Sequence, residues 1–134
     1  RFLLRLFGAK IGKKVIIRPS VKVTYPWKLS IGDYSWIGDN VDLYTLGNID
    51  IGKNVVVSQR SYLCTGSHDY KSDDFRIYAS KITIGSKCWL ATDVYVLTPV
   101  TEPRTKSVLT LDQGISNSSR LAPKSWLGFS ETLL

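Results

Sequence analysis

The sequence IGDYSWIGDNVDLYTLGNIDIGKNVVVSQRSYL, residues 31–63, decides the fold of this chain. An aliphatic residue recurs in it in steps of six, in two runs of three: Ile31, Ile37 and Leu43, then Ile51, Val57 and Leu63. The same step occurs before this stretch and after it, in the runs Ile11, Ile17, Val23 and Ile84, Leu90, Val96. Small or β-branched residues recur four positions after many of these. Twelve aliphatic residues in one register indicate a repeat architecture.

A step of six is what a short strand followed by a tight turn requires. A strand turns a side chain inward at every second residue, and the bend that follows needs a small residue, often Gly. Three such units close a triangular coil of about eighteen residues, and coils stack about 4.8 Å apart. One coil cannot bury its own apolar face, so several must stack into a continuous core. The alternative is an ordinary antiparallel β domain with alternating strands.

The repeat is interrupted at one place. The four runs begin at residues 11, 31, 51 and 84, so two intervals are twenty residues long and the third is 33. The excess predicts an outward loop, residues 69–80, and functional residues favour such loops. His68, the single histidine, lies where the third run stops, in the segment LCTGSHDY.

Length and composition bound the remaining possibilities. The 134 residues suit one domain, and 43% hydrophobic with 22% charged residues is ordinary globular usage. Two cysteines make no disulfide framework, and Cys64 and Cys88 fall at repeat positions expected to be buried. One histidine makes no multi-histidine metal site, so no metal is expected. No apolar run is long enough to span a membrane, and residues 1–10 do not suit a signal peptide, so we expect a cytoplasmic protein.

The basic charge gathers at one end. The net charge is +7, and residues 1–20 alone hold six basic residues and no acidic one. This end suits either a solvated basic helix or a surface that steers anionic partners: a phosphorylated cofactor, nucleic acid or an anionic membrane. No nucleic-acid-binding motif accompanies it, so no such partner is expected. Residues 1–10 suit a short helix with one apolar side.

Residues 11–101 resemble the hexapeptide-repeat acyltransferases, through VTYPWKLSIGDYSWIGDNV, LCTGSHDY and ITIGSKCWLATDVYV. Within that superfamily they are most similar to the sugar O-acetyltransferases, the maltose, galactoside and nodulation-factor group, and especially to the branch that acetylates colanic acid and other exopolysaccharides. The resemblance implies an all-β fold, a left-handed parallel β-helix. It also implies a homotrimer that uses acetyl-CoA and a saccharide acceptor, with active sites between neighbouring β-helices.

The resemblance also implies roles for particular residues. His68 takes the position of the general base, which removes the proton from the acceptor hydroxyl and then protonates the leaving CoA thiolate. Asp69 is a candidate to orient its imidazole, with Asp42 and Asp93 as competing partners. Contacts with CoA are implied for Trp89, Ala91 and Thr92. Acceptor binding is implied for Asn40, Asp42, Tyr44 and Thr45.

Residues 102–134 show no sixfold register, although the family continues there with further Ile-Gly hexads. We expect a non-repeat tail from a truncated, frame-shifted or divergent end. The sequence therefore predicts an acetyl-CoA-dependent sugar O-acetyltransferase, with a catalytically inactive β-helix, for assembly or carbohydrate binding, as the alternative. A hexapeptide-repeat carbonic anhydrase is excluded, because its zinc requires three histidines.

Overall fold

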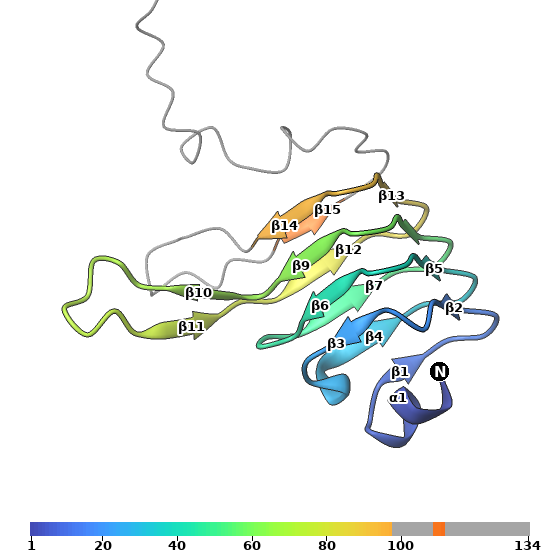
Figure 1. Ribbon diagram of the computed structural model, residues 1–134, viewed down its shortest axis with the longest axis horizontal. Helices are drawn as coiled ribbons and strands as arrows, with labels where there is room; N and C mark the ends of the chain where they lie inside the picture. Colours follow the sequence, from blue (N-terminus) through green and yellow to red (C-terminus); the bar gives the residue numbers. More distant parts are fainter. Residues whose placement is uncertain (98–108, 112–134) are drawn as a thin grey trace, which may run out of the picture.

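The computed structural model describes residues 1–97 and, for the backbone, residues 109–111. After a short helix, α1 (Phe2–Leu6), very short strands wind around three faces of a prism (Figure 1). The first face holds β1 (Lys10–Ile11), β4 (Leu29–Ile31), β7 (Ile49–Ile51), β12 (Ile82–Ile84) and β15 (Leu109–Leu111). The second face holds β2 (Ile16–Ile17), β5 (Trp36–Ile37), β8 (Val56–Val57) and β13 (Trp89–Leu90). The third face holds β3 (Lys22–Val23), β6 (Asp42–Tyr44), β9 (Tyr62–Cys64) and β14 (Tyr95–Leu97).

The sixfold runs form the core, as predicted. On the third face Val23 is in register with Leu43, Leu43 with Leu63, and Leu63 with Val96, and every strand pair on the three faces is parallel. Like residues therefore lie above like residues along the prism. Leu43 and Leu63 are almost wholly buried, as are the other run members from the second coil onward. Cys64 and Cys88 are buried and form no disulfide, which confirms their predicted place in the core.

The turns between strands repeat as strictly as the strands do. Between the first and second faces the residue with positive φ is Lys14, Tyr34, Asn54 or Lys87, at stacked positions of successive coils. Between the second and third faces it is Asn40, Arg60 or Asp93. These turns also stack closely: a Cβ on Gly32 would lie 2.7 Å from the carbonyl carbon of Gly52. Close stacking explains why Gly follows Ile at this turn.

Two arginines of the basic end close the open edge of the first coil. The Arg5 guanidinium donates to the carbonyl oxygens of Ile11 and Gly12, at 2.6 and 2.9 Å, and Arg1 donates to that of Val15 at 2.9 Å. Unpaired backbone groups at a sheet edge need such partners. Part of the basic charge is therefore structural.

Within residues 1–97 the two long excursions leave the prism at one corner, between the third and first faces. In the first coil this corner carries the 3₁₀ helix η1 (Pro26–Lys28), and in the third it carries residues 65–81. The predicted outward loop is there, but it is an ordered antiparallel hairpin of β10 (Gly66–His68) and β11 (Ile77–Ala79), which we call the arm (Figure 1). The arm therefore starts three residues before the predicted loop.

The tail differs from its prediction at one strand. β15 lies within residues 102–134, where no repeat was expected, and it pairs in parallel with β12, with Ile82 opposite Leu109. The rest of that tail lies outside the described residues. Among the residues that the structure describes, no helix has the length and apolar character to cross a membrane.

Candidate active site

His68 is the last residue of β10 and is presented by the arm. Three register pairs hold the hairpin together, with His68 opposite Ile77 and Gly66 opposite Ala79. Backbone hydrogen bonds extend the ladder, from Ser80 N–H to the carbonyl of Thr65 and from Asp69 N–H to that of Arg76, both 2.9 Å. The histidine is therefore exposed to solvent yet carried by a paired backbone rather than by an irregular loop.

The imidazole of His68 is fixed by Phe75 across the hairpin. Its Nδ1 lies 2.9 Å from the carbonyl oxygen of Phe75, and the two rings stack with centroids 4.8 Å apart and planes 12° apart. A carbonyl oxygen only accepts, so Nδ1 carries a proton, and in the neutral imidazole the lone pair is on Nε2. Nε2 of this tautomer is the nitrogen that can accept a proton.

None of the predicted carboxylate partners reaches His68. Asp69 instead accepts a hydrogen bond from the backbone N–H of Lys71, at 3.1 Å, because neighbouring strand residues point to opposite sides. Asp93 pairs with Arg60 at 2.8 Å, and this guanidinium lowers the pKa of the Asp93 carboxyl. Asp42 lies on β6, in the body of the prism. The group that orients the imidazole is the backbone carbonyl of Phe75, which cannot be predicted from residue types.

The four predicted acceptor residues are divided between different environments. Asn40 is exposed at a turn, and Asp42 and Tyr44 are half-buried on the outward side of β6. Thr45 is fully buried, and its hydroxyl donates to the carbonyl of Tyr25 and accepts from the Tyr25 N–H. Thr45 therefore holds the corner together and presents no group to a ligand.

The outward side of the third face carries a tyrosine that sequence reasoning missed. Tyr62 is in register with Asp42 and makes an edge contact with the ring of Tyr95, at 6.1 Å. Burial, followed by a hydrogen bond with Cys64, raises the pKa of Tyr62. Its phenol therefore stays neutral near pH 7. The sequence could have indicated this residue, because strand alternation turns position 62 outward next to the inward Leu63.

The predicted CoA residues lie away from His68 within one chain. Trp89 is about half exposed on the second face, where its Nε1 donates to the hydroxyl of Ser58 at 3.0 Å. Ala91 and Thr92 follow in the next turn. The second face is opposite the corner that carries the arm, because the prism has three sides. A single chain therefore does not bring these residues to the histidine.

Two curated proteins resemble most of the chain in sequence. Over 100 residues the chain is 70% identical to the colanic acid biosynthesis acetyltransferases named WcaF from Escherichia coli (strain K12) and Shigella flexneri. The match covers 75% of this chain and 55% of each relative, so the chain spans about half the length of the curated relatives it matches. No protein-family model matches the chain.

The solved structures that resemble it share the fold. A maltose O-acetyltransferase from Clostridium difficile 630 superposes with a TM-score of 0.66 at 20% identity, over 72% of this chain and 53% of the other. A hexapeptide-repeat acetyltransferase from Vibrio cholerae gives 0.66 at 24% identity, over 72% and 56%. The resemblance to the hexapeptide-repeat acyltransferases is confirmed. The fold is accordingly their left-handed parallel β-helix.

Another structural neighbour, with lower sequence identity, was solved with ligands. It is a variant of the N-acyltransferase AntD from Bacillus cereus, in complex with dTDP-4-amino-4,6-dideoxyglucose and coenzyme A. Its TM-score is 0.56 at 15% identity, over 72% of this chain and 67% of the other. At this identity the similarity supports the fold alone. Among the residues described here, no group of His, Cys, Asp and Glu side chains is arranged to hold a metal ion.

Proposed function

We propose that the protein transfers an acetyl group from acetyl-CoA to a sugar hydroxyl in exopolysaccharide biosynthesis, in the cytoplasm. The observation that carries the proposal is the contact of His68, an exposed residue whose Nδ1 lies 2.9 Å from the Phe75 carbonyl oxygen, so that Nδ1 donates and Nε2 is the nitrogen left to accept a proton. The acetyltransferase names of the 70% identical relatives support the reaction class. The ligands of the distant N-acyltransferase support CoA and a sugar as the kind of substrates.

The chemistry needs one base that acts twice. Nε2 of His68 takes the proton of the acceptor hydroxyl as the oxygen attacks the acetyl carbonyl of the thioester. The tetrahedral intermediate carries an oxyanion, which backbone N–H groups stabilise. When it collapses, the C–S bond breaks and the imidazolium returns the proton to the CoA thiolate. The Phe75 carbonyl oxygen stays bonded to Nδ1–H and favours the imidazolium that forms in between.

We propose that the site is completed by a second copy of the chain, in a homotrimer. Within one chain the second face and the arm lie on opposite sides of the prism. The second face also exposes an apolar row, in which Ile16, Trp36, Val56 and Trp89 are in register along its four strands. Apolar rows of this kind favour burial against another protein surface. Packing it beside a neighbour's arm brings Trp89, Ala91 and Thr92 toward that neighbour's His68.

The apolar row predicts the oligomeric state of a variant. We expect Trp36→Glu to dissociate the trimer into monomers, because a carboxylate cannot be desolvated in the centre of an apolar contact. Light scattering coupled to size-exclusion chromatography measures the mass. Trp27→Glu is the control, since Trp27 is also an exposed tryptophan but lies at the opposite corner. A Trp36→Glu protein of unchanged trimeric mass contradicts the assignment of this face.

Radiolabelled acetyl-CoA tests the reaction itself. The purified protein is incubated with it and with a panel of mono- and oligosaccharides, and transfer of label to saccharide is measured. We expect label in at least one acceptor, released by mild base as an O-ester is. A folded trimer that labels no acceptor contradicts the proposal and leaves the inactive assembly or carbohydrate-binding module.

A further inference from the structure

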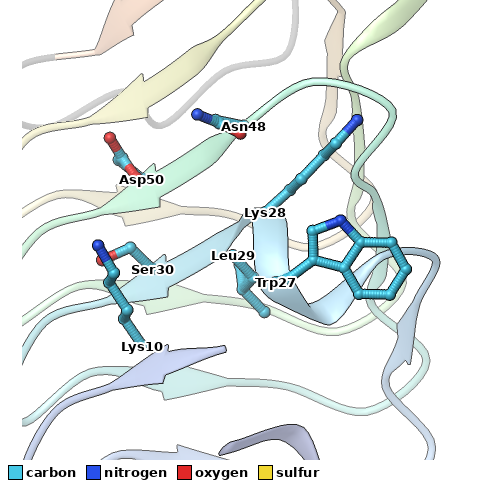
Figure 2. A pocket seen from close by; sticks show the side chains of 7 residues that line it. All are labelled: Lys10, Trp27, Lys28, Leu29, Ser30, Asn48 and Asp50. Carbon is cyan, nitrogen blue, oxygen red and sulfur yellow. The ribbon is translucent and has the colours of Figure 1, made fainter. Parts of the chain in front are cut away.

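A cavity of about 410 Å³ opens on the first face, beside the corner that carries η1, and none of the residues given a role above lines it (Figure 2). Its walls come from the first three coils. Figure 2 shows Trp27 and Lys28 on one side and Lys10, Ser30 and Asp50 on the other, from β1, β4 and β7. Leu29 and Asn48 complete the lining.

The most unusual member of the wall is Trp27. Its indole is 60% exposed, although burying a tryptophan is strongly favourable. The ring is not loose, because it contacts Tyr25 with centroids 5.2 Å apart, and its Cβ lies about 3.0 Å from the space that a Cβ on Gly8 would take. A held, uncovered aromatic face within a polar hollow is a surface on which the C–H face of a pyranose ring packs.

The opposite wall supplies the polar groups that a sugar ring also needs. Ser30 and Asp50 project from neighbouring parallel strands at the same register position, and Asn48 immediately precedes the second of these strands. A hydroxyl, a carboxylate and an amide together accept and donate hydrogen bonds in several directions. Pockets that bind polar ligands combine an apolar wall with a few such groups. The combination with Trp27 points to a saccharide.

The charges around the cavity select the kind of saccharide. The Asp50 carboxylate is already paired with Lys81 Nζ at 2.5 Å. Lys28 Nζ donates to the carbonyl of Leu46 at 2.5 Å and lies over the Tyr25 ring, at 5.3 Å from its centroid. Lys10 has no acidic partner among the residues that the structure describes. The cavity therefore keeps excess positive charge, which favours a sugar that carries a carboxylate.

We propose that this cavity binds a uronic-acid residue of an extended saccharide acceptor. The role as acceptor site rests on the proposed function. Cavity and arm share one corner: η1 leaves it in the first coil, and the arm leaves it in the third. Coils are spaced by about 4.8 Å, so the two lie about 10 Å apart along the prism. A chain of a few sugars along this corner places one residue over Trp27 and another at the arm.

Binding of two matched trisaccharides tests the proposal without any acetyl transfer. Cellotriose and its fully C6-oxidised form have the same backbone and differ in their carboxylates. We expect the oxidised form to bind more tightly in isothermal titration, and Trp27→Ala to raise both Kd values at least about tenfold, which is roughly 1.4 kcal/mol. Lys10→Gln is expected to remove most of the preference for the oxidised form. Tyr34→Ala and Lys22→Gln, an exposed aromatic and a lysine elsewhere on the prism, are the controls.

The outcomes separate this proposal from the proposed function. If neither trisaccharide binds, or if Trp27→Ala binds as the unaltered protein does, the cavity is not a saccharide site, whatever the enzyme transfers. Equal affinity for the two trisaccharides overturns the uronic-acid assignment. Binding that depends on Trp27, in a protein that labels no acceptor, contradicts the proposed function and leaves the cavity as a saccharide site.

Discussion

His68→Ala is expected to lower the turnover of acetyl transfer by about 10²–10⁴-fold, the usual contribution of a positioned general base. We expect kcat to fall and KM to change little, because the imidazole acts in the proton transfer of the chemical step and makes no large contact with CoA. Folding is expected to be unchanged, since the side chain is exposed and the arm is held by backbone pairing. Single-turnover and steady-state rates with labelled acetyl-CoA, together with circular dichroism, measure both.

Two further variants show whether the histidine is oriented as the structure has it. Phe75→Leu removes the stacked ring but keeps the carbonyl that accepts from Nδ1, so we expect a loss of only a few fold. Asp69→Asn is expected to leave turnover nearly unchanged, because that carboxylate caps the Lys71 N–H. If Asp69→Asn is as damaging as His68→Ala, the Phe75 carbonyl is not the orienting group. Equal turnover of His68→Ala and the unaltered protein removes the base from the mechanism.

The core was predictable because one periodicity controls it. Inward positions such as Ile37 and Leu43 must be aliphatic in every coil. The sixfold register therefore contains twelve aliphatic residues, and it can be recognised even if one of them is replaced. The arm was predictable for the same reason, because the third interval between runs is thirteen residues longer than the other two. Position in the repeat also placed Cys64 and Cys88 in the core.

The remaining features depend on the backbone or on single long-range contacts, for which residue type carries no signal. Lys14, Tyr34, Arg60 and Lys87 adopt positive φ at turns where Asn or Gly is usual, because the stacked coils impose the turn. The acceptor for the Nδ1 proton of His68 is a main-chain carbonyl, which any residue at position 75 supplies. Hairpin pairing in the arm follows from its two ends meeting at one corner of the prism, where the Ser80 N–H donates to the Thr65 carbonyl, a constraint that is not local in sequence.

The stability of the β-helix is expected to depend most on the stacked aliphatic rows, and Leu63→Ala tests this. Leu63 is completely buried, in register with Leu43 on one side and Val96 on the other. Truncation leaves a cavity between two coils that backbone hydrogen bonds prevent from collapsing. We expect the free energy of unfolding to fall by about 2–5 kcal/mol, measured by urea denaturation at fixed protein concentration.

Ile77→Ala is the matched control, because it removes a branched aliphatic side chain that is 54% exposed on the arm. Its expected effect on the free energy of unfolding is within about 0.5 kcal/mol. Stacking also predicts how two substitutions combine. Leu43→Ala and Leu63→Ala enlarge the same void, so the changes in the free energy of unfolding that they cause should not add. Strict additivity, or a loss for Leu63→Ala no greater than that for Ile77→Ala, would mean that the coils are held by their backbone ladders rather than by the packed interior.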